Sequence, residues 1–314
     1  MTRQYRTAAV IGTGMMGPGI AATLALGGVQ AAILSRTAES GEKGLADAVS
    51  LIDLLERNEL ASRSKAALAR GNLSASSRFA ESISGVDLVI ESAPENLSFK
   101  QDLFEKMDAL APPSTVLTSN TSGLSITAIA ERCVHPERVV TTHFWNPPHL
   151  MPLVEIVRGK KTEDDVVTSL RELLTACGKV PVVVKKDTPG QLGNRLQQAL
   201  VREAVNIVEQ GIADVEDVDL AAKAGFGLRL PVYGIFEHQD AVGLDMCLSV
   251  VDYVSQDLYN EPRAPEYMRN LVRDGHLGAK TGKGFYDWSK KDINAVKALR
   301  DQFILDFLRA QNRQ

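Results

Sequence analysis

His143 and Glu155 are the two side chains in this sequence best suited to move a proton together. An imidazole titrates near neutrality, so His143 could accept the proton of a hydroxyl group while hydride leaves the adjoining carbon. Glu155 stands in the otherwise apolar stretch "MPLVEIV", and a buried strand does not keep a carboxylate without a partner. We expect a His143–Glu155 pair; the alternative is a structural histidine, with Glu155 paired to an arginine.

Further polar side chains follow three apolar runs that are typical of buried strands. Glu95 and Asn96 lie in "ESAPEN", Asn120 and Ser122 lie in "SNTSG", and Asn146 follows His143 in "HFWNPPH". In a doubly wound sheet, ligands bind beyond the carboxyl ends of the strands, so these residues are candidates for one site. The alternative for "SNTS" is a helix N-cap, in which the hydroxyl of Ser122 or Ser125 satisfies backbone donors.

The stretch "VIGTGMMGPGIAATLA" has the glycine spacing G-x-G-x-x-G, between an apolar run and a helical pattern. Gly12 permits the tight turn, Gly14 lets backbone N–H groups approach a pyrophosphate, and Gly17 allows the helix to pack closely on the strand. We therefore predict a dinucleotide site, lined also by Met15 and Met16.

The choice of coenzyme depends on the residues after the second strand, which read "LSRT". An NAD site usually carries an acidic residue there, whereas the Ser35 hydroxyl and the Arg36 guanidinium can bind a 2′-phosphate. The sequence thus favours NADP(H) over NAD, with Thr37 as a further contact. On the alternative interpretation Arg36 is a solvated cation that stacks on adenine.

Alternating strands and helices predict an α/β protein, an N-terminal Rossmann doubly wound parallel sheet followed by a C-terminal all-helical domain. The pattern becomes helical after "KKDTPG", so we expect domains at 1–186 and 187–314. The expected strands are 7–11, 30–34, 86–92, 115–120 and 138–144, with two more in "PLVEIV" and "KVPVVVK"; helices are expected at 17–26, 99–110 and 125–133, and two more between 37 and 77.

Composition narrows the class of protein. The 314 residues carry a formal charge of −4 and no Lys/Arg-rich run, which argues against a nucleic-acid partner. The apolar segments fall short of membrane-spanning length. The three cysteines are odd in number and are not spaced as metal ligands, so we expect reduced thiols, no metal site and a cytoplasmic protein.

The chain resembles the 3-hydroxyacyl-CoA dehydrogenase family, which acts on L-3-hydroxyacyl substrates, over nearly its whole length. The resemblance is carried in order by "VIGTGMMGPGIA", "LVIESAPENLSFK", "SNTSGLSIT", "HFWNPPHLMPLVEIV", "KKDTPGQLGNRL", "VGLD" and "GHLGAKTGKGFYDW". It implies that His143 is the catalytic base, that Glu155 orients it, and that Ser122 and Asn194 contact the substrate.

The resemblance also implies that Glu95 and Lys100 line the cofactor site, together with Asn120. In this family the helical domain usually mediates dimerisation, so a homodimer is expected. The implied reaction transfers hydride between the coenzyme and the hydroxyl or carbonyl group of a 3-hydroxy or 3-oxo acid derivative.

Several positions depart from the thioester-using members of the family. Glu56 and Glu59 stand where those members carry lysines suited to CoA phosphates, Gly123 replaces a serine, and Arg229 could clamp a free carboxylate. The alternative substrate is therefore a small hydroxy acid or ring-attached alcohol without CoA, as in gulonate dehydrogenase or a pyridine-carboxylate dehydrogenase. A more remote alternative is a non-catalytic structural protein like lambda-crystallin.

Overall fold

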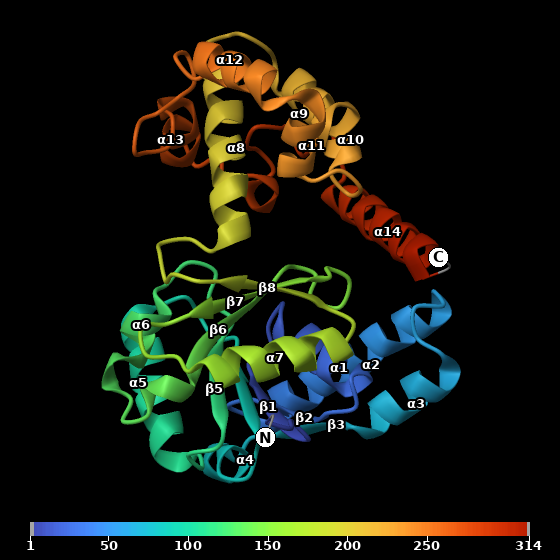
Figure 1. Cartoon of the computed structure of the whole chain (residues 1–314). Coiled ribbons are helices and arrows are strands. Elements are labelled where there is room, and N and C mark those ends of the chain that lie inside the picture. Colours follow the sequence, from blue (N-terminus) through green and yellow to red (C-terminus); the bar gives the residue numbers. More distant parts are fainter. Residues whose placement is uncertain (1–2, 313–314) are drawn as a thin grey trace. The chain divides into compact units, whose positions relative to one another are not determined.

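The computed structural model describes residues 3–312, and their contacts divide them into two compact units. The first unit runs to Asn194 and resumes at Leu299, and the second is Arg195–Ala298 (Figure 1). Compared with the expected division after Lys186, the chain divides eight residues later, and its last part groups with the first unit. The physical reason is that Ile304 and Leu305 pack into the apolar core of the first unit.

The first unit contains an eight-stranded sheet with the order β3-β2-β1-β4-β5-β6-β7-β8. Its strands are β1 Thr7–Ile11, β2 Gln30–Leu34, β3 Leu73–Ser76, β4 Leu88–Glu91, β5 Val116–Ser119, β6 Val139–Phe144, β7 Leu153–Arg158 and β8 Val180–Val184. The helices of this part are α1 Gly17–Leu26, α2 Ala38–Arg57, α3 Arg63–Gly71, α4 Phe79–Ile83, α5 Leu97–Leu110, α6 Ile126–Ile129 and α7 Asp164–Ala176. The expected Rossmann architecture is confirmed.

Two apolar clusters, one on each face of the sheet, hold the first unit together. Neighbouring residues of β1 belong to different clusters, Val10 to one and Ala9 to the other, as the alternation of side chains along a strand requires. Helices α1, α2 and α7 contribute to the first cluster, and α5 and α6 contribute to the second. The sheet is thus covered by helices on both faces.

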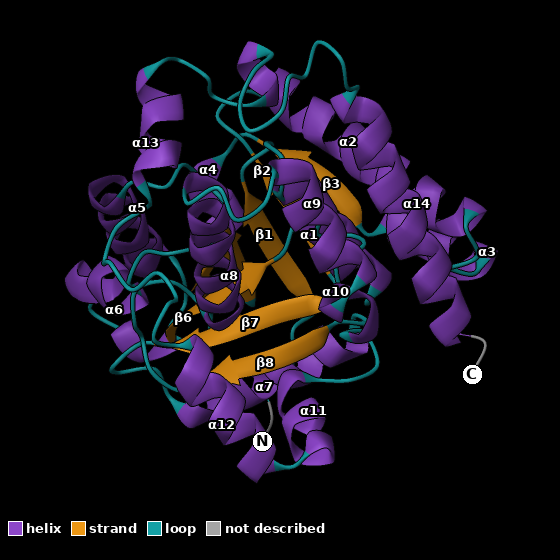
Figure 2. Ribbon diagram, turned by 90° about the horizontal axis from the view of Figure 1, so that it is seen from above, coloured by secondary structure: helices purple, strands orange, loops and turns teal. Residues whose placement is uncertain are grey.

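The sheet departs from the expected parallel arrangement at one pair of strands. β6 and β7 are antiparallel, whereas β7 and β8 are parallel and lie side by side (Figure 2). The connection 145–152 between β6 and β7 is too short for the helical crossover that parallel neighbours need. This reversal brings the end of β6 beside the start of β7.

The segment 37–77 contains the two expected helices, but it also contains β3, which was not expected. The sequence of β3, "LSAS", is short and half polar, as suits a strand that forms an edge of the sheet and pairs only with β2. Thr37 caps α2 by accepting a hydrogen bond from the backbone N–H of Ser40 at 3.2 Å. Ser62 caps α3 in the same way.

The rest of the chain is helical, as expected. Its helices are α8 Leu192–Glu209, α9 Val215–Ala224, α10 Phe226–Arg229, α11 Ile235–Val242, α12 Leu244–Val254, α13 Glu266–Arg273 and α14 Ile293–Asn312. Helices α9 to α13 contain no fully buried residue, although they are rich in large apolar side chains. Within residues 3–312, no helix is both long enough and apolar enough to cross a membrane.

Candidate functional site

The glycine turn between β1 and α1 has the steric form that a dinucleotide requires. Gly12 has a φ of 116°, and a Cβ there would lie 2.5 Å from the carbonyl oxygen of Ser92. A Cβ at Gly17 would lie 1.9 Å from the carbonyl oxygen of Gly12. A Cβ at Gly14, by contrast, would meet nothing within 4 Å. Two glycines are therefore needed by the fold, and the third leaves open space where a phosphate can approach the backbone.

The residues around this turn leave its amide groups accessible. Met16 precedes α1 and makes no side-chain cap to it, so the first N–H groups of the helix are available to an anion. Met15 is 78% exposed. A nicotinamide dinucleotide fits this donor set, and its pyrophosphate would lie at Gly14 and the start of α1.

The residues after β2 differ in whether their side chains already make hydrogen bonds within the protein. The Ser35 hydroxyl donates to the carbonyl oxygen of Thr37 at 2.6 Å, and the Thr37 hydroxyl caps α2. Arg36 is exposed, and its side chain has no hydrogen bond or ion pair within residues 3–312. Of the three residues expected to contact the ribose, Arg36 is the one best able to reach a ligand phosphate.

His143 and Glu155 face each other because β6 and β7 pair them in register. The Nδ1 atom of His143 lies 2.7 Å from Oε2 of Glu155, and the two side chains are 8% and 1% exposed. This contact assigns the Nδ1 hydrogen to the bond with the carboxylate, which leaves Nε2 with a lone pair. His143 is thus arranged to accept a proton at Nε2.

Two further donors hold the carboxylate of Glu155. The indole Nε1–H of Trp145 donates to Oε2 at 3.0 Å, and the backbone N–H of Gly193 donates to Oε1 at 2.8 Å. Burial raises the pKa of Glu155, but the hydrogen bonds from His143, Gly193 and Trp145 outweigh it and bring the pKa below its ordinary value. Glu155 is therefore ionised at neutral pH and can stabilise a protonated His143.

Glu95 organises the turn that contains Ser122. Its Oε1 atom accepts hydrogen bonds from the Thr121 hydroxyl at 2.6 Å and from the backbone N–H groups of Ser122 and Gly123 at 3.1 and 3.2 Å. Burial raises the pKa of Glu95, but the bond from Thr121, the Lys100 ammonium and the two backbone donors lower it overall. Glu95 is thus an anion that fixes this turn.

Lys100 lies beneath the surface of the site, in a pair that the sequence analysis missed. Its ammonium is 1% exposed and donates to Oε1 of Glu91 at 2.6 Å, with Glu95 at 3.6 Å. The other oxygen of Glu91 accepts from the Ser119 hydroxyl at 2.5 Å. The apolar run "LVIE" that ends in Glu91 could have revealed it, by the argument that identified Glu155.

The asparagines join these parts to one another. Oδ1 of Asn120 accepts from the backbone N–H of Phe144 at 2.8 Å, next to His143. The amide of Asn194 donates to the carbonyl oxygen of Ser122 at 2.8 Å. Asn146 is exposed in the connection after β6. The structure thus links Asn194 to the Ser122 turn, and Asn120 to the strand of the histidine.

Other expected contacts have a different place or role. Arg229 is exposed at the end of α10, in the second unit, so its role stays a prediction. Asn96 caps α5 by accepting from the backbone N–H of Phe99 at 2.9 Å. Ser125 caps α6, which makes the N-cap interpretation correct for that serine. No three potential metal ligands are grouped together within residues 3–312.

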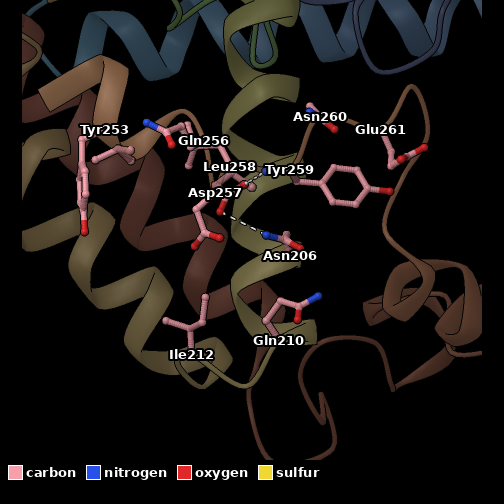
Figure 3. A pocket seen from close by; sticks show the side chains of 12 residues that line it. Asn206, Gln210, Ile212, Tyr253, Gln256, Asp257, Leu258, Tyr259, Asn260 and Glu261 are labelled. Carbon is pink, nitrogen blue, oxygen red and sulfur yellow. Dashed lines mark hydrogen bonds between the residues drawn. The ribbon is translucent and has the colours of Figure 1, made fainter. Parts of the chain in front are cut away.

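A hollow of about 990 Å³ lies in the second unit. Figure 3 shows it from close by, with Asn206 and Gln210 on α8. Its lining is Glu203, Asn206, Gln210, Ile212, Tyr253, Val254, Gln256, Asp257, Leu258, Tyr259, Asn260 and Glu261. The carboxylate of Glu203 there accepts from the backbone N–H of Tyr259 at 2.8 Å. None of the candidate site residues from the sequence lies in this lining.

Two family models match the chain in sequence. The model described as 3-hydroxyacyl-CoA dehydrogenase, NAD binding domain, matches residues 7–188, and the model of the C-terminal domain of that enzyme matches residues 190–288. The chain is 36% identical over 298 residues to a 5-formyl-3-hydroxy-2-methylpyridine 4-carboxylate 5-dehydrogenase of Mesorhizobium japonicum, with 94% of each chain covered. It is 35% identical over 288 residues to a 3-hydroxybutyryl-CoA dehydrogenase of Clostridioides difficile, covering 90% of this chain and 99% of the relative.

Solved structures agree with the sequence relatives. The structure of a 5-formyl-3-hydroxy-2-methylpyridine 4-carboxylic acid 5-dehydrogenase, described as an NAD⁺-dependent dismutase, matches with a TM-score of 0.91 at 34% identity and covers 98% of both chains. An (S)-3-hydroxybutyryl-CoA dehydrogenase from Ralstonia eutropha matches with a TM-score of 0.75 at 32% identity, covering 90% of this chain and 99% of that one.

Proposed function

The chain belongs to the 3-hydroxyacyl-CoA dehydrogenase family, and we propose that it interconverts the hydroxyl and carbonyl forms of a small carboxylate-bearing substrate. Its relatives are dehydrogenases that act on CH–OH groups, so the chain is an oxidoreductase with a nicotinamide coenzyme. The observation that carries the proposal is the buried His143–Glu155 pair on the same sheet as the open glycine turn.

In the direction of oxidation, Nε2 of His143 removes the proton of the substrate hydroxyl. Glu155 stabilises the imidazolium that results, through the bond to Nδ1. The chemistry that a bound nicotinamide supplies is the acceptance of the hydride from the carbinol carbon. The Ser122 hydroxyl binds the substrate oxygen and, in the reverse direction, polarises the carbonyl. The side-chain amide of Asn194 holds Ser122 in place by donating a hydrogen bond to the backbone carbonyl oxygen of Ser122.

The comparison favours a substrate without CoA. The relative that acts on a pyridine carboxylate matches with a TM-score of 0.91, against 0.75 for a CoA-dependent one. Glu56 opposes the binding of CoA phosphates less strongly than the sequence suggested, because it forms an ion pair with Arg70 that partly neutralises its charge. Arg229 remains our candidate to bind the free carboxylate.

The CoA thioester is the second candidate substrate, because a 3-hydroxybutyryl-CoA dehydrogenase covers 90% of this chain at 35% identity. Initial rates of reduction separate the two. We expect turnover with a pyridine carboxylate that carries an aldehyde, and little with acetoacetyl-CoA. Rapid reduction of acetoacetyl-CoA, with none of the free carboxylates, would establish the thioester function instead.

We propose that the coenzyme is NADP(H), on the strength of Arg36. No acidic side chain follows β2 there to bind a 2′-hydroxyl, and the guanidinium is free to pair with a 2′-phosphate. The opposing fact is that the relative with a TM-score of 0.91 is described as NAD⁺-dependent. The ratio of kcat/KM for NADPH and NADH decides between them, and Arg36→Ser should lower that ratio at least tenfold if Arg36 binds the phosphate.

We also propose that the protein is a homodimer formed through its helical unit. The support is the exposure of large apolar side chains on α11 and α12, including Phe236 at 84% and Leu248 at 61%. A surface with so many exposed apolar groups is typical of one that packs against another chain.

A further inference from the structure

The indole of Trp145 makes a contact that the proton transfer described above does not use. Oε2 of Glu155 receives two nitrogen donors, Nδ1 of His143 at 2.7 Å and Nε1 of Trp145 at 3.0 Å. The side chain of Glu155 is only 1% exposed, so the protein rather than bulk water satisfies this oxygen. The histidine and the indole therefore share the charge of one buried carboxylate oxygen.

The backbone and the neighbouring rings fix the place of the indole. A Cβ at Gly193 would lie 2.5 Å from Cζ2 of Trp145, so the ring lies directly against the backbone of that glycine. The rings of Trp145 and His143 have their centroids 5.8 Å apart, at an interplanar angle of 52°. Gly193 also donates its N–H to Glu155. The tight packing thus aims the indole N–H at the carboxylate.

The other groups around the His143–Glu155 pair point to Trp145 as the side chain that modulates the charge of Glu155. On β8, the residue in register with Glu155 is Val182, which is apolar. Two other carboxylates of this unit are engaged elsewhere: Asp187 accepts from the Ser125 hydroxyl and from the N–H of Thr127, and Glu95 binds the Ser122 turn. From the start of α8 the pair receives an uncharged amide, that of Gly193.

We propose that Trp145 is a positioning residue for the reaction, whose indole N–H shares the charge of Glu155 with His143 and thereby sets the pH range in which the histidine can act as base. The proposal rests on the proposed function of His143. A hydrogen bond to an ionised carboxylate stabilises its charge. The part of the charge that the indole satisfies attracts a protonated imidazole less strongly, so the histidine gives up its proton at lower pH.

The variant Trp145→Phe keeps an aromatic ring and removes the donor. The acid limb of the pH profile of kcat/KM for oxidation should move to higher pH by about 0.5–1 unit, which corresponds to the net contribution of one hydrogen bond of ordinary strength. Trp288→Phe, which changes the other tryptophan of the chain, is the matched control and should leave the profile unchanged. A folded Trp145→Phe variant with the parent profile would overturn the proposal.

A parallel variant, His143→Gln, separates this proposal from the proposed function. If His143→Gln loses turnover while Trp145→Phe keeps the parent profile, the role of Trp145 alone is refuted. If His143→Gln retains full turnover, the histidine is not the base, and both proposals fall together.

Fluorescence gives a second readout, which does not depend on the folding of Trp145→Phe. In Trp288→Phe, Trp145 is the sole indole, and a neighbouring imidazolium quenches indole emission. This emission should titrate with the same midpoint as the acid limb, and adding Glu155→Gln should move the midpoint to lower pH. Emission that stays constant through the acid limb would show that the indole does not sense His143, contrary to the proposal.

Discussion

The side chains of the site differ in which of their polar atoms already make hydrogen bonds within the protein. His143 uses Nδ1 toward Glu155, so Nε2 is left for the substrate. Glu155 is saturated by donors and kept ionised, whereas Ser122 keeps a hydroxyl whose contact to Glu95 is long, at 3.4 Å. The two groups proposed to touch the substrate, Nε2 of His143 and the Ser122 hydroxyl, are thus those without a short hydrogen bond inside the protein.

Replacement of the base provides the first prediction. His143→Gln should lower kcat by about 10²–10⁴-fold, the usual contribution of a general base, while coenzyme binding is retained. The measurement is the initial rate of oxidation, together with the quenching of protein fluorescence by NADPH. His135→Gln is the control, because that half-exposed histidine pairs with Glu137 outside the site. Equal rates for the two variants would contradict the assignment.

The buried Glu91–Lys100 pair gives a prediction about stability. Glu91→Gln leaves the Lys100 ammonium, 1% exposed, without a carboxylate at hydrogen-bond distance, and should lower the free energy of unfolding by about 3–5 kcal/mol. Chemical denaturation measures this loss. Glu81→Gln, which breaks an exposed pair with Arg78, should have little effect. A Glu91→Gln protein as stable as Glu81→Gln would show that the pair is not essential.

The sequence predicted these residues unequally. A carboxylate within an apolar strand sequence indicated Glu155. The same pattern in "LVIE" indicates Glu91, although it was not used there. The indole bond of Trp145 could not be predicted, because the direction of the N–H depends on Gly193, which is distant in sequence. Lys100 was identified through the resemblance, but its pairing with a buried acid was not.

At the scale of elements, different glycines of the turn between β1 and α1 serve the fold and the binding of the ligand. Gly14→Ala should leave the thermal unfolding temperature nearly unchanged, because the added Cβ meets nothing within 4 Å, but it should raise the KM for coenzyme at least tenfold. Gly17→Ala places a Cβ 1.9 Å from a carbonyl oxygen and should reduce stability itself. Thermal unfolding and coenzyme titration of both variants check this. Unchanged coenzyme binding in Gly14→Ala would place the pyrophosphate elsewhere.

The elements that the sequence predicted well are those with strong local signals. The bounds of β1, α1 and β2 agree with expectation, since apolar runs and the glycines at both ends of α1 delimit them. β3 was missed because "LSAS" carries no apolar run. The direction of β7 was missed although the short connection 145–152 indicated it, because strand patterns alone do not distinguish parallel from antiparallel neighbours.

At the scale of the whole molecule, the second unit is rich in apolar surface that a partner chain would cover. We expect light scattering during size-exclusion chromatography to give twice the mass of one chain. Leu248→Asp, on α12, should produce monomers or lower the dimer affinity at least tenfold. Leu68→Asp changes a leucine on α3 of the first unit that is 72% exposed, against 61% for Leu248, and serves as control. A single-chain mass for the parent protein at micromolar concentration would refute the dimer.

The antiparallel pairing of β6 and β7 constrains how this site can change over evolutionary time. His143 and Glu155 face each other through the register of two strands. Adding or deleting one residue inside either strand would turn one partner to the opposite face of the sheet. The same insertion between Pro147 and Pro152 would leave the pair intact. Relatives that keep this chemistry should therefore vary in loop length there, while the number of residues within each strand stays fixed.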